Sequence, residues 1–433
     1  MEKQESRPTP AGLVTSGQRA ELMRQGNASS VLRAVLAYGP VSRAEIARHT
    51  GISAPSVTKL TAALIEAELL TELAPVEPTQ GRPRVPLALD GDHVVALGLH
   101  IGLLRTTFGL VGPDGSVVAE RELPHHELPD LSPERIVEQA VAGVEAFLKD
   151  RLGGRRLVGT GVTVGGWVDG ARGLVVEHGP LGWHGVRLLE LLNGRLPGPV
   201  VLEQTVRAIA RAELWFGAGR ETDDFVLVMI GNVLGAAIVV DRTVHRGPGA
   251  AAGAIEHLPA TDDPDAPRCP VCGASCLVVT ASDTALVARA RELGVLPQRG
   301  RADDPDGSDS LALERLIALA RPAGSGSGDE RAQELLRTRA RRVGRAVAGI
   351  VDLLNPSKVV LAGGILVAEE YLDELRTEVG RRSHRGLAVA DDILPAVFGS
   401  RTLVRSSAVP VLERVITEPF TALGLLRSQP PAV

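Results

Sequence analysis

The sequence predicts an α/β protein in which a small helical unit with a β-wing precedes a body of two similar lobes. Apolar residues recur at helical spacing in the first 67 residues, and short extended runs follow them. Beyond residue 90, a pattern of strands with glycine at the first turn occurs twice, and helices and further strands follow each copy. The three cysteines of the chain all lie in CPVCGASC, at 269–276.

The composition sets the first limits on function. At 433 residues the chain is long enough for two or three domains, each with its own core. A formal net charge of −5 argues against general affinity for nucleic acid, so any contact with DNA must be local. The longest apolar run, residues 225–240, is shorter than a membrane span. MEKQESRPTP at the start has no apolar signal region, so we expect a cytoplasmic protein with no membrane partner.

Start and stop signals predict three helices in the N-terminal unit. The first has apolar residues at helical spacing and ends at Gly39-Pro40. Ser42 and Glu45 form a capping box that opens a second, short helix. Gly51 supplies the turn, and we expect Ser53 to cap a third helix that runs to about residue 67.

The second and third helices, joined by HTGIS, are typical of a helix-turn-helix that binds double-stranded DNA. Val57, Leu60 and Leu64 share one face of the third helix, so the opposite face would enter the major groove. A plain helical bundle is the alternative. The expected DNA contacts in the helices are Arg43, Ser53, Ala54, Pro55, Ser56, Thr58 and Lys59.

A β-wing is predicted after the third helix. GRPR, at 81–84, precedes an apolar extended run, and a polar loop leads into it. Arg82 and Arg84 on such a wing would lie along phosphates or enter a minor groove. Solvated loop charges are the alternative for both arginines.

The body contains a quasi-repeat. The first copy reads VVALGLHIG, LRTTFGLV and SVVAEREL, and the second reads DFVLVMIG and VLGAAIVV before another turn. Two such lobes facing a cleft describe the actin-like, sugar-kinase (ribonuclease H-like) ATPase fold. In this fold the two glycine turns hold phosphates through backbone N–H groups. Gly363-Gly364, after the predicted strand KVVLA, is where an adenosine would lie.

These patterns divide the chain into consecutive parts. We predict a disordered segment at 1–18, a winged helix-turn-helix head at 19–90, a first lobe at 91–205 completed by a C-terminal helix at about 405–433, and a second lobe at 206–404. A low-complexity insert at about 298–329, with a helical piece near its middle, is interpreted as a flexible surface excursion.

Cys269, Cys272 and Cys276, with His257 twelve positions upstream of the first, form a candidate metal centre in the second lobe. Three thiolates and one imidazole are the ligand set of a closed tetrahedral site. We therefore predict structural Zn²⁺. A redox C-x-x-C pair is the alternative, but nothing nearby resembles a thioredoxin-like unit.

With these motifs the chain resembles the ROK proteins, a family of repressors, unassigned reading frames and kinases. The resemblance rests on VSRAEIARHTGIS, GRPR, VTVGGWVDG, LGW, AELWFGAG, GAIEH, the cysteine segment, TAS and DLLNPSKVVLAGGIL. The sugar kinases of the family lack a DNA-binding head, so the resemblance implies a transcriptional regulator. The middle cysteine is displaced by one position from the family pattern.

The resemblance also implies that catalysis has been lost. Where the kinases resemble D-x-G-G-T, residues 100–104 read HIGLL, so two leucines stand where phosphate must approach the backbone. The position of the general base falls on Thr205, which cannot take a proton near neutral pH. Glu203 is two positions off register. We expect no catalytic residues.

The sugar pocket that the resemblance implies is altered as well. Ala254, Val278 and Pro180 replace two glutamates and an asparagine that recognise sugar hydroxyls in the family. Gly165, Trp183 and Glu256 are the remaining candidates for ligand binding. We expect an effector other than a common sugar, or none.

The sequence therefore predicts a DNA-binding regulator, a repressor, whose body is a degenerate sugar kinase. Its expected partners are a DNA operator, a sugar or other small-molecule effector, and further copies of the chain in a dimer or tetramer that matches two half-sites. Two alternatives stay open: a sugar kinase with an appended head, and a ligand-independent regulator that acts through partner proteins.

Overall fold

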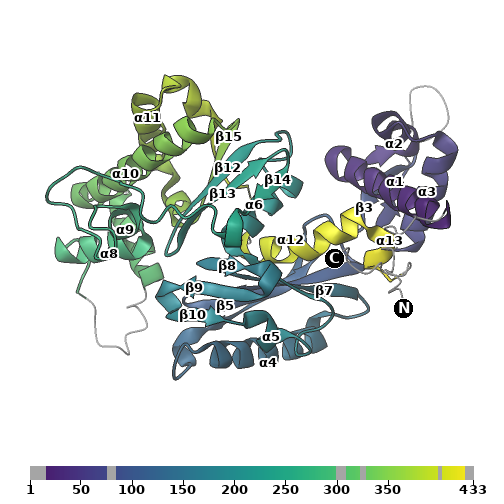
Figure 1. Cartoon of the computed structure of the whole chain (residues 1–433), viewed down its shortest axis with the longest axis horizontal. Coiled ribbons are helices and arrows are strands. Elements are labelled where there is room, and N and C mark those ends of the chain that lie inside the picture. The colour runs from purple at the N-terminus through teal and green to yellow at the C-terminus, as the bar shows by residue number, and fades with distance from the viewer. Residues whose placement is uncertain (1–15, 76–83, 299–308, 322–327, 398–401, 425–433) are drawn as a thin grey trace, which may run out of the picture.

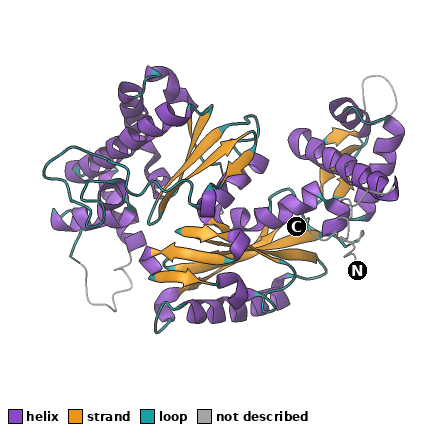
Figure 2. Ribbon diagram, in the orientation of Figure 1, coloured by secondary structure: helices purple, strands orange, loops and turns teal. Residues whose placement is uncertain are grey.

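The computed structural model describes residues 16–75, 84–298, 309–321, 328–397 and 402–424 (Figure 1). Two lobes, each built on a sheet with helices on its faces, lie side by side, and the head lies beyond the end of the C-terminal helix (Figure 2). Arg82, most of the predicted disordered segment, two parts of the predicted insert and residues 425–433 lie outside the described residues.

The three predicted helices of the head are confirmed: α1 (Ser16–Tyr38), α2 (Arg43–Thr50) and α3 (Ala54–Glu66). The capping box is present, since the backbone N–H of Ser42 donates to the Glu45 carboxylate at 2.9 Å. Gly51 ends α2 at φ +70°, a conformation that favours glycine. Ser53 occupies the N-cap of α3, but the predicted side-chain cap is wrong, because its hydroxyl donates to Ser56 Oγ at 2.9 Å.

A three-stranded antiparallel sheet completes the head. Its strands are β1 (Val41–Ser42), β2 (Leu70–Glu72) and β3 (Pro86–Leu89), in the order β1-β3-β2. The strands β2 and β3 are the two arms of the predicted wing, and the residues between them are only partly described.

The predicted duplication is visible in the strand order of the two large sheets. The first contains β4 (Val94–Ile101), β5 (Arg105–Val111), β6 (Val117–Pro124), β7 (Arg156–Val164) and β11 (Val200–Gln204), in the order β6-β5-β4-β7-β11. The second contains β12 (Phe225–Ile230), β13 (Leu234–Val240), β14 (Thr243–His245), β15 (Lys358–Ala362) and β16 (Ile393–Pro395), in the matching order β14-β13-β12-β15-β16. Each sheet has an antiparallel meander followed by two parallel strands, as the actin-like, sugar-kinase fold requires.

Helices cover both faces of the first sheet (Figure 2). The helices α4 (Pro133–Arg151) and α5 (Leu188–Leu192) pack on one face, and α12 (Thr402–Thr417) packs on the other. Glycines make room for α12: a Cβ at Gly98 or Gly161 would collide with the backbone carbonyl of Val404 or Ser407. A small sheet of β8 (Trp167–Asp169), β9 (Leu174–His178) and β10 (Trp183–Val186) lies at one end.

The second sheet lies between α10 (Glu330–Leu354) with α11 (Leu372–Arg382) on one face and α6 (Thr205–Phe216) on the other. The remaining helices are α7 (Leu277–Ala281), α8 (Asp283–Glu292), α9 (Asp309–Ala320) and α13 (Pro419–Ala422). Short 3-10 segments are η1 (His125–Glu127), η2 (Gly170–Arg172), η3 (Gly179–Leu181), η4 (Pro248–Ala250), η6 (Gly364–Tyr371) and η7 (Gly386–Asp392).

The interpretation of residues 298–329 as a surface excursion is wrong for α9. Leu316 and Ile317 are buried, and they pack in one apolar cluster with residues of α8 and α10. The apolar residues of this helix recur at helical spacing, and that pattern already indicated a buried face. The low-complexity segments on both sides of the helix are typical of surface loops, and for this reason the whole stretch was predicted to be one.

The head is anchored to the body through the C-terminal helices. Its apolar core is continuous with Val415 and Ile416 of α12 and with Phe420 of α13. The Arg24 guanidinium lies over the Phe420 ring at 4.7 Å from its centroid. The single predicted C-terminal helix is thus two helices, and both contact the head.

None of the helices in the described part of the chain is long and apolar enough to cross a membrane.

The packing of α9 predicts a difference between two leucines of the same helix. Leu316→Ala should lower the free energy of unfolding by about 2–5 kcal/mol, because it leaves a cavity in a closed apolar cluster. Leu319→Ala should change it by less than about 0.5 kcal/mol, since Leu319 is 39% exposed. Chemical denaturation of both variants gives the comparison, and equal effects would mean that α9 is not packed as described.

Candidate functional site

The outer face of α3 is free for a partner. Val57, Leu60, Thr61 and Leu64 are buried against the head, as predicted. On the opposite face the exposed residues are Ala54, Pro55, Thr58, Lys59 and Ala62, and Ser56 is half-buried beside them. Small side chains at the start of the helix leave its backbone accessible, and Lys59 adds a positive charge one turn later.

The predicted arginine contacts of the head differ from one another in the structure. Arg43 is held inside the head: its Nε donates to Thr61 Oγ1 at 3.0 Å, and its Nη2 donates to Glu72 at 2.7 Å. Arg84 is mostly exposed at the base of the wing and lies 3.8 Å from Glu45. Arg43 therefore joins α2, α3 and β2, while the Arg84 side chain remains mostly exposed beside Glu45.

The structure brings the four predicted metal ligands together. One ligand atom from each of His257, Cys269, Cys272 and Cys276 lies within 4.8 Å of the other three. His257 Nδ1 lies 3.6 Å from Cys269 Sγ and 3.7 Å from Cys276 Sγ. Three sulfurs and one imidazole nitrogen at these separations fit a tetrahedral Zn²⁺ centre after a small contraction. The displaced middle cysteine does not prevent the cluster from forming.

The cysteine segment is shaped by backbone hydrogen bonds. Gly273 takes φ +72° in the turn between Cys272 and Cys276, and its N–H donates to the Cys269 carbonyl at 2.9 Å. A backbone N–H at Cys272 lowers the pKa of Cys269 to about 7 and favours its thiolate. Burial raises the pKa of Cys276 to about 11, so this thiol needs a bound cation to ionise near neutral pH.

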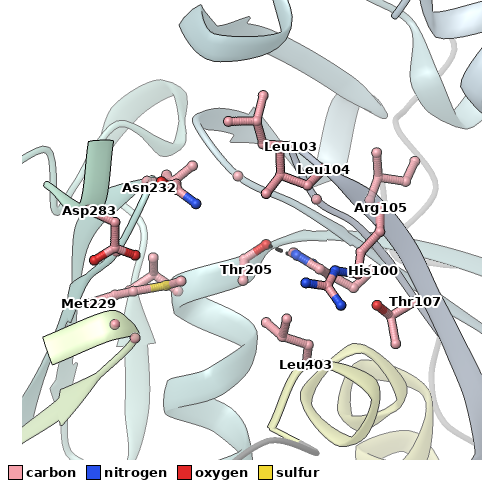
Figure 3. A pocket seen from close by; sticks show the side chains of 18 of the residues that line it. His100, Leu103, Leu104, Arg105, Thr107, Thr205, Met229, Asn232, Asp283 and Leu403 are labelled. Carbon is pink, nitrogen blue, oxygen red and sulfur yellow. Dashed lines mark hydrogen bonds between the residues drawn. The ribbon is translucent and has the colours of Figure 1, made fainter. Parts of the chain in front are cut away.

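A cavity of about 390 Å³ lies between the lobes, at the two glycine turns (Figure 3). We call it the cleft cavity. The first lobe contributes the turn at 100–105, the second contributes the turn at 231–233, and Gly363 and Gly364 follow β15 at its wall. Leu103 and Leu104 stand at the first turn (Figure 3), so the place where a phosphate would approach the backbone is apolar.

His100 and Thr205 meet in the cleft cavity (Figure 3), with 3.4 Å between His100 Nδ1 and Thr205 Oγ1. Thr205 opens α6 and is 2% exposed. Burial, with smaller contributions from His178 and His125, lowers the pKa of His100 to about 4. Near neutral pH the place of the general base is therefore occupied by a hydroxyl beside an uncharged imidazole.

Two buried carboxylates near the cleft, Glu203 and Asp283, are paired with arginine. Glu203 accepts hydrogen bonds from Arg207 at 2.8 Å and from Arg246 at 2.6 Å. Burial acts to raise the pKa of Glu203, but the two guanidinium groups outweigh it and hold this pKa below its ordinary value. Asp283 lines the cleft cavity and is paired with the buried Arg339. Burial raises the pKa of Asp283 despite that pairing.

A second cavity, of about 440 Å³, lies beside the cysteine cluster, and we call it the effector cavity. It brings together Pro180, Ala254 and Val278, the three positions identified as altered in the sugar pocket. Glu256 also lines it, as predicted, and burial raises the pKa of this carboxyl. The metal-ligand candidate His257 forms part of the same wall.

Two predicted ligand contacts lie elsewhere. Trp183 is 2% exposed in the core of the first lobe, where its Nε1 donates to the Leu131 carbonyl at 2.8 Å, so its assignment to the pocket is wrong. From β10 the ring points into the core, where its apolar surface packs in the cluster and its N–H has an acceptor. Gly165 lines the cleft cavity and not the effector cavity.

Sequence reasoning missed several residues that line these cavities. Trp167, 41% exposed, is the tryptophan of the effector cavity, and Gln204 lies near it. His178 and Asp283 line the cleft cavity. Trp167 lies in VTVGGWVDG and Asp283 directly follows TAS, so both motifs pointed to the right segments without showing which side chain faces inward.

Comparisons with known proteins agree with this architecture. The profile of the ROK family matches residues 96–409. A transcriptional regulator of Mycobacterium tuberculosis is 32% identical over 401 residues, which cover 92% of this chain and 87% of that protein. The N-acetylglucosamine repressor of Escherichia coli O157:H7 is 28% identical over 364 residues, which cover 84% and 86%. The crystal structure of a ROK family transcriptional regulator, a homolog of the E. coli MLC protein, has a TM-score of 0.71 at 23% identity and covers 93% of this chain and 100% of its own.

The cysteine cluster generates a prediction about metal. Cys272→Ser should release bound zinc and lower the melting temperature, because a closed four-ligand site loses one ligand. Elemental analysis and thermal melting measure the two effects. Val271→Ser is the matched control, since Val271 is adjacent and 78% exposed. A purified wild-type protein without zinc, or equal behaviour of the two variants, would contradict the assignment.

Proposed function

This chain belongs to the ROK family, and from that membership we propose that it is a DNA-binding transcriptional regulator of the repressor type. The observation that carries the proposal is the exposed face of α3 on a head that is anchored to a ROK body. The named relatives are a transcriptional regulator and a repressor. This function places the protein in the cytoplasm, with a double-stranded operator as its partner.

In this proposal α3 enters the major groove. Its first two turns, with Ser56, Thr58 and Lys59, contact base edges and phosphates, and Arg84 lies along the DNA backbone from the wing. Arg43 positions α3 and does not contact DNA, because Thr61 and Glu72 hold its guanidinium. One head reads one half-site, so the regulator acts as a homo-oligomer whose paired heads match two half-sites.

The body is proposed to be a sensor without kinase activity. Leu103 and Leu104 occupy the first phosphate turn, and Thr205 stands in the place of the general base. Glu203 cannot substitute, because two arginines neutralise it. The loss of a general base alone costs about 10²–10⁴ in rate.

Helix α6 offers a physical route from the cavities to the head. It begins at Thr205 in the cleft cavity and ends at Phe216. Near that end Trp215 packs against the core of the head, with the Arg33 guanidinium 5.2 Å from its ring centroid. Arg220 then donates to the carbonyls of Leu36 and Ala37, at the end of α1, at 3.1 and 2.6 Å. A ligand that moves the lobes would therefore move the heads and change their spacing.

Structural Zn²⁺, held by His257, Cys269, Cys272 and Cys276, would fix one wall of the effector cavity. The small effector proposed for this cavity differs from the sugars of the family, because Pro180, Ala254 and Val278 remove acceptors that sugar hydroxyls need.

The DNA-binding face is tested with Lys59→Ala. On an operator fragment recovered by genomic pull-down, the variant should bind about tenfold more weakly and reduce the slope of log affinity against log salt by about one, because one phosphate contact is lost. Electrophoretic mobility shift at several salt concentrations measures both quantities.

Lys149→Ala is the matched control, because Lys149 is an exposed lysine on α4, in the body. It should leave affinity and salt slope unchanged. If Lys59→Ala behaved like Lys149→Ala, α3 would not be the DNA-binding helix.

The loss of kinase activity predicts that the chain consumes no ATP above background with a panel of hexoses in a coupled assay. Thr205→Asp alone should stay inactive, because Leu103 and Leu104 still fill the first phosphate turn. Hexokinase in the same assay is the positive control. Sugar-dependent ATP consumption by the wild-type chain would show that the body is an active kinase and would contradict the proposal.

A further inference from the structure

We propose that the cleft cavity binds an uncharged, largely apolar small molecule that carries a hydroxyl or N–H group, at the place where the kinases of this fold bind a nucleotide. Its volume of about 390 Å³ lies in the range of small-molecule sites. This cavity adjoins the effector cavity and shares Asn232 and Val233 with it. The inference does not depend on DNA binding.

The hydrogen-bonding character of His178 is fixed by its neighbours. This histidine is 1% exposed, and the backbone N–H of Leu181 donates to its Nδ1 at 3.2 Å. Burial lowers its pKa, so the ring is neutral near pH 7. With Nδ1 accepting, the proton must be on Nε2. That atom lies close to Gly165, another residue of the cavity wall: a Cβ added to this glycine would stand 3.1 Å from it. His178 thus presents a donor.

The character of His100 follows from a chain of hydroxyls. Ser407 donates to the Leu403 carbonyl at 2.7 Å, so its oxygen must accept the proton of Thr163, 2.5 Å away. Thr163 Oγ1 can then only accept from His100 Nδ1, at 3.1 Å. Since burial keeps the ring neutral, His100 Nε2 is a bare acceptor.

His100 is 8% exposed, and Nε2 has no hydrogen-bond partner in the described parts of the chain. The cavity wall therefore contains one acceptor, His100 Nε2, and one donor, His178 Nε2. A hydroxyl on a ligand can bind at either place, because it can donate to His100 Nε2 or accept from His178 Nε2. Asn232 Oδ1 is a further buried acceptor without a partner, on the opposite lobe (Figure 3).

The charges of the cavity wall cancel. Its charged side chains are Arg105, Glu122 and Asp283. Arg105 donates to Glu122 at 2.7 Å, and Asp283 is paired with Arg339 from behind the wall. The charged side chains of the wall are thus paired with each other or with Arg339, so a nucleotide would bring several negative charges into a site whose own charges are already balanced.

Much of the remaining wall is apolar. Its large apolar side chains come from both lobes and include Leu103, Leu104, Val206, Met229, Val233 and Leu403. Figure 3 shows Leu103 and Leu104 facing Met229 and Asn232 across the space, with Leu403 below His100. A ligand with an apolar body would bury its surface against both lobes and so hold them together.

The proposal is tested on the full chain, without DNA, by titration calorimetry with four probes. The probes are 2-naphthol, naphthalene, naphthalene-2-sulfonate and ATP with Mg²⁺. We expect 2-naphthol to bind about tenfold more tightly than naphthalene, which is the value of one net hydrogen bond. The two anionic probes should bind at least about tenfold more weakly than 2-naphthol, because the charges of the cavity wall are already balanced.

Variants locate the site. Leu104→Arg, at a half-buried turn position, should lower the affinity for 2-naphthol at least about tenfold. Leu353→Arg, at an 81% exposed leucine of α10, should leave its affinity unchanged. The His100→Leu variant should bind 2-naphthol only as tightly as naphthalene, and its affinity for naphthalene should equal that of the wild-type chain. If His100→Leu does not fold, Leu104→Arg and the probe series decide the question.

Three outcomes would overturn the proposal: anionic probes that bind as tightly as 2-naphthol, 2-naphthol that does not bind below about 1 mM, and a Leu104→Arg variant with wild-type affinity. Failure of DNA binding in the Lys59 experiment leaves this result unaffected, so the two proposals can be judged separately.

Discussion

The close packing of α12 on the first sheet is the constraint on which the rest of the structure depends. Gly98 and Gly161 let the helix backbone approach the strands, and Val404, Ala408 and Leu412 fill the remaining space. The same helix continues into the core of the head through Val415 and Ile416. Through Ser407 it also reaches Thr163 and fixes the proton of His100. One helix therefore sets the position of the head and the hydrogen bonding of His100 in the cleft.

Charge compensation stabilises buried carboxylates around the cleft. The carboxylates of Glu203 and Asp283 are buried, and each is paired with arginine. A buried carboxylate that lost its partner would destabilise the protein, so these pairs contribute to the stability of the fold around the cavity. In the proposals above, the same two-lobed scaffold binds a neutral ligand instead of a nucleotide.

The sequence was sufficient wherever the determining contacts are local or repeated. The capping box at Ser42, the turn at Gly51 and the duplicated meander were predicted because each depends on neighbours in the chain or on a pattern that occurs twice. Which tryptophan faces the effector cavity could not be predicted, because Trp167 and Trp183 lie in the same small sheet and their partners, the carbonyls of Gly249 and Leu131, are far away in the sequence. Which ring nitrogen of His100 and His178 carries the proton could not be predicted either, since this depends on partners such as Ser407 that lie far away in the sequence.

The position of α12 in the chain has a consequence for biosynthesis. The strand β4 ends at Ile101, whereas the helix that covers its second face begins at Thr402. While the nascent chain is still on the ribosome, the first sheet exposes that apolar face until residues 402–417 have emerged. The head meets its anchor on the body equally late, so an unfinished chain cannot present the head in its final orientation. Premature termination before residue 402 would leave a product that is both unstable and unable to regulate.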